Sequence, residues 1–254
     1  MSEIVRIAVL STFLAASASP LFAAEPVTTS EHFRYSWRLR GGLAWVAGLR
    51  FPISGIGLLK NDPTPNGSVQ SELVITGSGN RDGKYIYRSE IDRDLVRTLV
   101  SSNGYQWDGR VRNEQTRFDY GSGLARTRKE RENRPVETKV RKLQASDMRD
   151  VLTGIHYLRH HADAMSAPVA SEIYSDGSVY PVVFRPLGGS HVSVDGKQVA
   201  ARGFEITAAP GDRKKWPGGV KVWLSADERR IPLRIEIQQG GLASLHLVLV
   251  NGNS

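Results

Sequence analysis

The sequence contains no cysteine in its 254 residues. Disulfide bonds, thiolate metal ligands, a cysteine nucleophile and a thiol for lipid attachment are therefore excluded. Long hydrophobic runs are also missing. The longest, residues 7–18, has about a dozen residues, well short of the roughly 20 that a membrane-spanning helix needs. We therefore expect no transmembrane anchor.

The amino-terminal segment has the pattern of a secretory signal peptide. Arg6 precedes the apolar run, and the small residues Ala23 and Ala24 follow it. The pattern predicts cleavage of residues 1–24 and a soluble periplasmic protein. Residues 25–254 are numerous enough to bury a core without disulfides, so we expect them to form a single β-rich domain.

The chain is basic, with a formal net charge of +8. An exported protein with this charge meets phospholipid head groups, lipopolysaccharide or other anionic envelope polymers rather than nucleic acid. The charge therefore indicates a lipid or another anionic envelope component as a partner, and no nucleic acid. Surface solubility explains the same surplus equally well.

Alternating apolar residues predict strands through most of the chain. Phe33, Tyr35, Trp37 and Leu39 begin the series, which continues through residues 43–47, 69–76, 84–89, 116–120, 220–224, 231–237 and 245–249. The pairs at 176–177 and 195–196 are both Asp-Gly, which favours tight hairpins. Short connections make the last three strands an antiparallel meander. Residues 94–100 fit a short helix or a strand.

One helix is predicted, over residues 147–162. Its apolar residues Val151, Leu152, Ile155 and Leu158 recur three or four positions apart, and Ser146 or Asp147 could cap its first turn. Helix and strand do not alternate, which argues against a nucleotide-binding parallel sheet. The expected fold is mainly β, with a strongly curved antiparallel sheet, a half-open or closed barrel, around this helix.

Basic residues far outnumber acidic ones in residues 125–142. Such a segment suits a solvated hairpin with an edge strand, where lysine and arginine discourage pairing with a second molecule. An anion-binding surface is the alternative.

Two segments resemble an exported bacterial family known as domain of unknown function 3108. Residues 150–159, Asp-Val-Leu-Thr-Gly-Ile-His-Tyr-Leu-Arg, are similar to the family's helix, although Thr153 and His156 stand where serine and tyrosine are usual. Residues 222–236, with Trp before a Ser-x-Asp turn and then Pro-Leu, are similar to its closing hairpin. The resemblance implies export and β architecture, and no activity. The hairpin is also similar to the end of periplasmic lipoprotein carriers, whose half-open barrels hold acyl chains.

Residues with metal or hydrolytic chemistry occur in two places. His156 and His160 lie four apart on the predicted helix, so their rings could reach one metal ion, and Asp163 follows three residues after His160, but no metal site is predicted. Cations near the end of a helix are also favoured by the helix dipole alone. Ser225 and Asp227 could belong to a hydrolase, but no nucleophile elbow surrounds a serine, and aspartate is favoured in turns. No cofactor is predicted.

These patterns favour a non-enzymatic carrier or assembly factor that binds a lipid, lipoprotein or other envelope component. The tryptophans Trp37, Trp45, Trp107, Trp216 and Trp223 could line a cavity, although aromatic residues in strands usually belong to a core. We predict Trp37, Trp223, Leu152 and Ile155 as lining residues, with Arg128, Lys129, Arg131 and Lys142 at a basic rim. The alternatives are a hydrolase or metal-dependent enzyme acting on an envelope polymer, and a scaffold that binds a partner protein.

Overall fold

The computed structural model describes residues 29–42, 52–78, 83–94, 96–107, 109–143, 145–211, 215–239 and 243–250. The predicted signal peptide and the predicted strand at 43–47 lie outside these residues. Within the described residues, no helix combines the length and the apolar character needed to cross a membrane.

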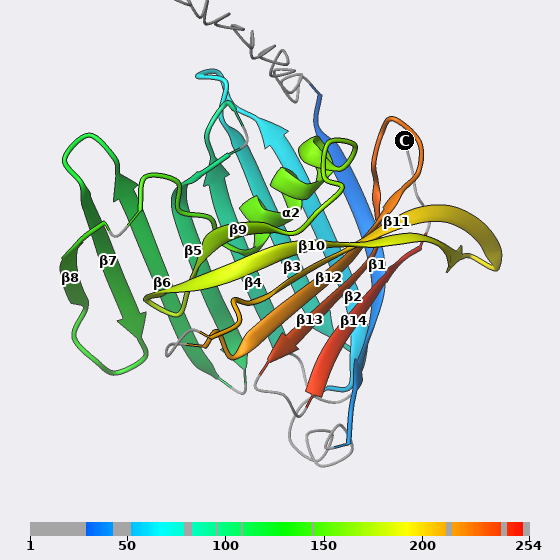
Figure 1. Ribbon diagram of the computed structural model, residues 1–254. Helices are drawn as coiled ribbons and strands as arrows, with labels where there is room; N and C mark the ends of the chain where they lie inside the picture. The colour runs from blue at the N-terminus through cyan, green and yellow to red at the C-terminus, as the bar shows by residue number, and fades with distance from the viewer. Residues whose placement is uncertain are drawn as a thin grey trace, which may run out of the picture.

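The described chain forms one antiparallel sheet of fourteen strands and carries one helix, α2 (Figure 1). The strands are β1 (Glu31–Arg40), β2 (Ser54–Pro63), β3 (Val69–Gly77), β4 (Gly83–Ile91), β5 (Thr98–Trp107), β6 (Arg110–Asp119), β7 (Leu124–Arg131), β8 (Glu137–Lys142), β9 (Val169–Ser175), β10 (Ser178–Val194), β11 (Lys197–Ala208), β12 (Gly218–Ser225), β13 (Pro232–Gln239) and β14 (Ala243–Leu249).

The strand order is β8-β7-β6-β5-β4-β3-β2-β1-β14-β13-β12-β11-β10-β9. The first and last strands pair at its centre, with Trp37 opposite Leu247. Among the described strands, β8 and β9 have a hydrogen-bonded neighbour on one side only, so the sheet stays open. The predicted curved antiparallel sheet with one helix is confirmed, and of the two forms considered it takes the open one.

The predicted tight hairpins are present. Asp176 and Gly177 have φ values of 48° and 76°, and Asp195 and Gly196 have 47° and 79°. Two successive positive φ angles define the turn type whose twist matches that of paired strands. These turns join β9 to β10 and β10 to β11. The closing meander of β12, β13 and β14 is also as predicted.

The ambiguous segment at 94–100 contains a turn and then a strand. The carboxylate of Asp92 accepts hydrogen bonds from the amides of Val96 and Arg97 (2.9 and 3.1 Å). These bonds close the turn before β5 begins at Thr98. A side chain that binds its own following backbone in this way competes with helix formation.

Helix α2 spans Val151–His161, so it begins later than the predicted residue 147. Its cap is Asp150, whose side chain accepts a hydrogen bond from the amide of Thr153 (2.9 Å). The carbonyl groups of Met148 and Arg149 accept bonds from the amides of Thr98 and Tyr174. The backbone before Asp150 is therefore committed to the sheet, and neither Ser146 nor Asp147 can start the helix.

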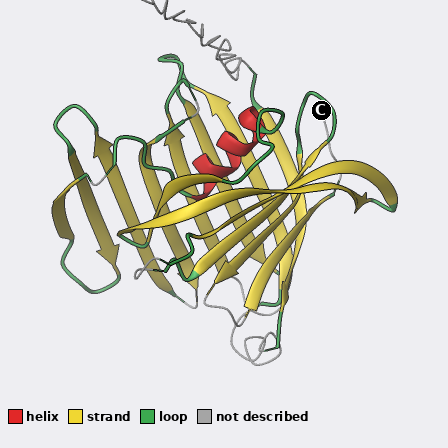
Figure 2. Ribbon diagram, in the orientation of Figure 1, coloured by secondary structure: helices red, strands yellow, loops and turns green. Residues whose placement is uncertain are grey.

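The sheet curls so that its β9 edge lies over the inner face of β6. The hydroxyl groups of Thr116 and Tyr174 share a hydrogen bond of 2.7 Å, and the rings of Phe118 and Tyr174 meet edge to face at 5.0 Å. Arg141 on β8 donates a hydrogen bond to the carbonyl group of Gly177 in the β9–β10 turn. Figure 2 shows the helix enclosed between the two layers that this curl creates.

The core lies between the two layers, around the apolar side of α2. Leu152, Ile155 and Leu158 contribute from the helix, and the inner faces of the strands supply the rest. The largest fully buried side chains are Tyr35, Phe184, Phe204, Leu73, Ile91, Met148, Leu158, Ile173, Ile206, Leu224 and Ile235. Figure 1 shows β7 and β8 extending to the left beyond the helix and the front strands.

We expect Asp150→Ala to lower the free energy of unfolding by about 2 kcal/mol, because it removes a helix cap and leaves the buried hydroxyl of Ser89 without its acceptor. Urea denaturation measures the change. The matched control is Asp147→Ala. Asp147 is half exposed, and its one ion pair among the described residues is with Arg149, so we expect a loss of about 1 kcal/mol or less. Equal losses in the two variants would contradict the assignment of the cap.

Candidate functional site

The inner face of the sheet changes from apolar to cationic across one row of neighbouring side chains. The register places Ile75 opposite Tyr85, Tyr85 opposite Tyr105, Tyr105 opposite Arg112, and Arg112 opposite Arg131. Side chains that are directly opposite in adjacent strands share one face of a sheet. The row therefore leads from the core at β3 to the basic hairpin of β7 and β8.

A parallel row repeats this gradient. It runs from Leu73 through Tyr87, Asn103 and Glu114 to Lys129. Glu114 is buried, and one of its oxygen atoms, Oε2, lies 2.8 Å from the ammonium group of Lys129. The carboxylate thus places a compensating negative charge among the cations of this face.

A cavity of about 450 Å³ lies between the first turn of α2 and the strands β3 to β6. The helix contributes Leu152, and the segment before β12 contributes Trp216. The lining residues are Leu73, Tyr85, Tyr87, Arg88, Ser89, Ser101, Ser102, Asn103, Gly104, Tyr105, Arg112, Asp150, Val151, Leu152, Tyr174, Ser175, Asp176, Trp216, Pro217, Gly218, Ile237 and Gln238. Four tyrosines and a tryptophan give it broad aromatic walls with hydroxyl groups at their ends.

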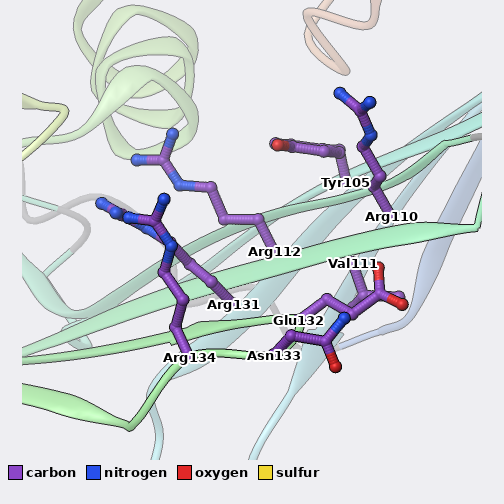
Figure 3. Close-up of a pocket in the computed structure, with 8 residues that line it drawn as sticks. All are labelled: Tyr105, Arg110, Val111, Arg112, Arg131, Glu132, Asn133 and Arg134. Carbon is purple, nitrogen blue, oxygen red and sulfur yellow. The ribbon is translucent and has the colours of Figure 1, made fainter.

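A second hollow of about 470 Å³ adjoins the cavity. It is lined by Tyr105, Arg110, Val111, Arg112, Arg131, Glu132, Asn133 and Arg134 (Figure 3). In Figure 3 the guanidinium groups of Arg112, Arg131 and Arg134 point to the same side of the strands. Tyr105 and Arg112 line both spaces, so the aromatic cavity and the arginine-rich hollow lie side by side.

A buried carboxyl group forms part of the cavity wall. Burial raises the pKa of Asp150, while hydrogen bonds from Ser89 and from the amide of Thr153 act in the opposite direction. The hydroxyl groups of Thr98 and Thr153 share a bond of 2.7 Å beside it. These bonds hold the first turn of α2 rigidly against β4 and β5, which keeps this wall of the cavity in place.

A second polar cluster anchors the other end of the helix. Arg159 donates two hydrogen bonds to the carboxylate of Glu31 (2.7 and 2.9 Å). The side-chain oxygen of Asn61 lies 3.0 Å from Nε2 of His156 and 2.9 Å from the hydroxyl of Ser71. Burial would raise the pKa of Glu31, but the bonds and the charge of Arg159 lower it below its usual value. The cluster orients α2 toward β1, β2 and β3.

The structure does not bring the three candidate metal ligands together. His156 is buried and directed at Asn61, whereas the carboxylate of Asp163 pairs with Arg202 and Arg230. No group of three histidine, aspartate or glutamate side chains in the described residues could hold a metal ion. His160 is on the same helix but has no ligand set around it in this part of the chain.

Ser225 and Asp227 form a turn. The hydroxyl of Ser225 donates to the carboxylate of Asp227 (2.6 Å) and accepts from the amide of Ile231 (2.8 Å). The hydroxyl thus donates one hydrogen bond and accepts one within the β12–β13 connection. These hydrogen bonds favour the structural interpretation of the two residues.

The predicted lining residues occupy different places. Leu152 lines the cavity, and Ile155 is buried one turn further along the helix. Trp37 is in the core, where its indole nitrogen donates to the carbonyl of Thr76 (2.9 Å). Trp223 alternates with buried neighbours in β12 and so lies on the outer face, where Arg234 stacks on its ring at 4.7 Å.

The four predicted rim residues also lie in different places. Arg131 lines the hollow, and Lys129 lies beside it on the inner face, bound to Glu114. Arg128 is exposed on the opposite face of β7, paired with Glu130, and Lys142 is exposed at the end of β8. Contact of any of these eight residues with a ligand stays a prediction.

Sequence reasoning missed most of the aromatic wall. Tyr85 and Tyr87 alternate within β4, so the period-two pattern could have placed them on one face, whereas Tyr105 joins them through its pairing with Tyr85. The sequence marks Trp216 as one of five tryptophans that could line a cavity, with no signal that sets it apart. Its position depends on the segment before β12 folding over the sheet, and no local pattern signals that fold. Trp45 and the side chain of Trp107 lie outside the described residues.

The fold and site define a class of protein, an open and strongly curved antiparallel sheet that holds a single helix and a cavity on its inner face. Residues 63–240, more than half of the chain, match the family described as protein of unknown function DUF3108. The chain belongs to this family, and the resemblance read from residues 150–159 and 222–236 is confirmed.

Two solved structures are similar. The beta-barrel-like protein of domain of unknown function DUF1849 from Brucella abortus has a TM-score of 0.61 at 12% sequence identity, over 87% of this chain and 95% of that chain. The lipoprotein LppX of Mycobacterium tuberculosis has a TM-score of 0.31 at 10% identity, over 89% and 88%. The first likeness shows a shared fold. No curated protein matches the sequence.

We expect the stability of the protein to fall as the pH is lowered below about 6.5. Burial, and then the charge of Arg159, lower the pKa of His156 to about 3. The unfolded chain binds a proton at this residue below pH 6.5 and the folded protein does not, so the stability is present above pH 6.5 and lost toward pH 3. One such group contributes a slope of about 1.4 kcal/mol per pH unit.

Urea denaturation between pH 7 and pH 5 tests this expectation. His156→Gln keeps a donor for Asn61 and should reduce the slope by about one proton. His191→Gln, at an exposed position on β10, is the control and should alter the slope by less. A slope that His156→Gln does not alter would show that His156 is not held neutral.

Proposed function

We propose that the protein is an exported, non-enzymatic carrier of the bacterial cell envelope that holds a lipid, or the lipid-bearing part of another envelope component, in the cavity beside α2. The observation that carries the proposal is the cavity of about 450 Å³ with aromatic and aliphatic walls. Its size falls within the range of roughly 300–1,000 Å³ that small-molecule sites occupy.

The composition of the walls supports an amphiphilic ligand. Tyr85, Tyr87 and Trp216 offer flat apolar faces, and Leu152 adds an aliphatic side chain. The cationic side chain of Arg112 lies where the cavity meets the hollow. An apolar chain would gain from contact with the walls, and a polar head group would remain near the charged face.

Export is supported by the signal-peptide pattern of residues 1–24, and the net charge of +8 suits a compartment bordered by anionic head groups. In that setting a carrier would shield an apolar chain from water. The open sheet supports this role, since β7 and β8 extend beyond the front strands (Figure 1).

A partner-binding scaffold is the second candidate, because the described edge strand β8 has no neighbour on its outer side. Val140 is 57% exposed on this strand. The strand is also rich in lysine and arginine, which oppose the addition of another strand. This composition favours the carrier.

Native mass spectrometry of the mature protein, purified gently from the periplasm, tests the carrier. We expect a stoichiometric bound lipid that denaturation releases. Asn103→Trp should reduce its occupancy about tenfold, because the indole would fill the space between Tyr87 and Glu114, at a cost of roughly 1.4 kcal/mol in binding.

The matched control is Gln115→Trp, which adds the same side chain on the exposed outer face of β6. It should leave the occupancy unchanged. A bare protein mass in every preparation would contradict the carrier, and crosslinking in intact cells to one protein partner would then favour the scaffold.

A further inference from the structure

We propose that the hollow lined by Arg112, Arg131 and Arg134 binds a phosphate or pyrophosphate group, and that this group is the head group of the amphiphile held in the cavity. The inference rests on the proposed function for the apolar part of the ligand. The charge of the head group rests on the arginines themselves.

The backbone brings the three guanidinium groups together. Arg112 and Arg131 are directly opposite in the antiparallel pair β6–β7. Arg134 follows in the β7–β8 connection, where its amide donates to the carbonyl of Arg131 (3.2 Å). Asn133 between them has a φ of 55°, the left-handed conformation that asparagine tolerates. The turn thereby returns Arg134 to the hollow (Figure 3).

The charges around the hollow do not balance. Glu114 serves both Arg112 (3.1 Å) and Lys129 (2.8 Å), and Glu137 lies 3.9 Å from Arg131. Figure 3 shows the carboxylate of Glu132 pointing away from the three guanidinium groups.

Within the described residues no carboxylate forms an ion pair with Arg110 or Arg134. Like charges that are directly opposite in a sheet repel each other. A group with two or more negative charges would remove this repulsion, whereas a single carboxylate would leave part of it.

One nitrogen atom in the cluster lacks a partner. Nε of Arg112 is buried and makes no hydrogen bond within the described residues. Its terminal nitrogen binds Oε2 of Glu114 (3.1 Å), which holds the guanidinium plane, and Oε1 of Glu114 is likewise buried without a partner in the described residues. Guanidinium groups bind phosphate oxygens in pairs of parallel hydrogen bonds, and several arginines around one hollow suit a tetrahedral anion.

The hollow and the cavity share a wall. Tyr105 lines both, and its ring lies 6.1 Å from that of Tyr85, at an interplanar angle of 41°. A ligand with an apolar chain against Tyr85 and Tyr87 would therefore present its phosphate to the arginines. The apolar-to-cationic row of the inner face matches the polarity of such a molecule.

Calorimetric titration of the full mature chain with inorganic pyrophosphate tests the anion site directly. We expect Arg131→Gln combined with Arg134→Gln to weaken binding at least about tenfold. The matched control combines Arg126→Gln with Arg128→Gln. These residues are exposed on the opposite face of β7, and the net charge changes by the same amount. Equal melting temperatures establish that both variants fold.

The proposal is overturned if the two double variants lose affinity equally, because binding would then follow net charge alone. It is also overturned if pyrophosphate does not bind the wild-type chain. A selective loss in the Arg131 and Arg134 variant supports it.

Lipid released from the wild type and from both variants separates this inference from the carrier. A phosphate-bearing lipid whose occupancy falls only in the Arg131 and Arg134 variant supports both. A lipid without phosphate, unaffected by either variant, would leave the carrier standing and overturn the head-group site. Selective pyrophosphate binding with no released lipid would show a site for a free phosphate compound and contradict the carrier.

Discussion

The guanidinium group of Arg159 joins three parts of the chain that are far apart in the sequence. It binds the carboxylate of Glu31 on β1 and the carbonyl groups of Arg229 and Arg230 in the β12–β13 connection. A buried charge is tolerated only when its hydrogen bonds are satisfied, so these partners cannot be exchanged freely. The position of α2 follows from them, and the cavity forms at the opposite end of the helix, where Asp150 caps it against β4 and β5.

The sheet stays open because its inner face changes from apolar to cationic side chains, and the same change shapes the site. Strands β1 to β4 present apolar side chains to α2, whereas β8 presents Lys139 and Arg141 on the inner face. Charged side chains cannot fill a core, so β8 does not close against β9. The β9 edge packs instead over β6, through Phe118 and Tyr174. One end of the inner face is thus a core and the other a solvated cationic surface, with the cavity between them.

Much of the fold could be predicted because its signals are local. Alternation placed most strands, and the Asp-Gly pairs placed two hairpins. The first residue of α2 could not be predicted, because Asp147 and Asp150 are both acceptable caps. Asp150 is the cap because the carbonyl groups of Met148 and Arg149 accept hydrogen bonds from β5 and β9, which keeps the preceding backbone out of the helix. The cavity was harder still. Trp223 looked like a lining residue by type, yet its place in the alternation of β12 turns it to the outer face.

The sequence alone determined the β-rich class, the single apolar helix, the turn chemistry and the family, since each depends on residues close together in the chain. The tertiary structure decided the pairing of β1 with β14, the curl that carries β9 onto β6, and the meeting of Tyr105 with Arg112 and Arg131. Some of these contacts join distant parts of the chain. The others depend on the register in which neighbouring strands pair. The site therefore exists only in the folded sheet, because register and curvature arise from packing across the whole core and not from any local pattern.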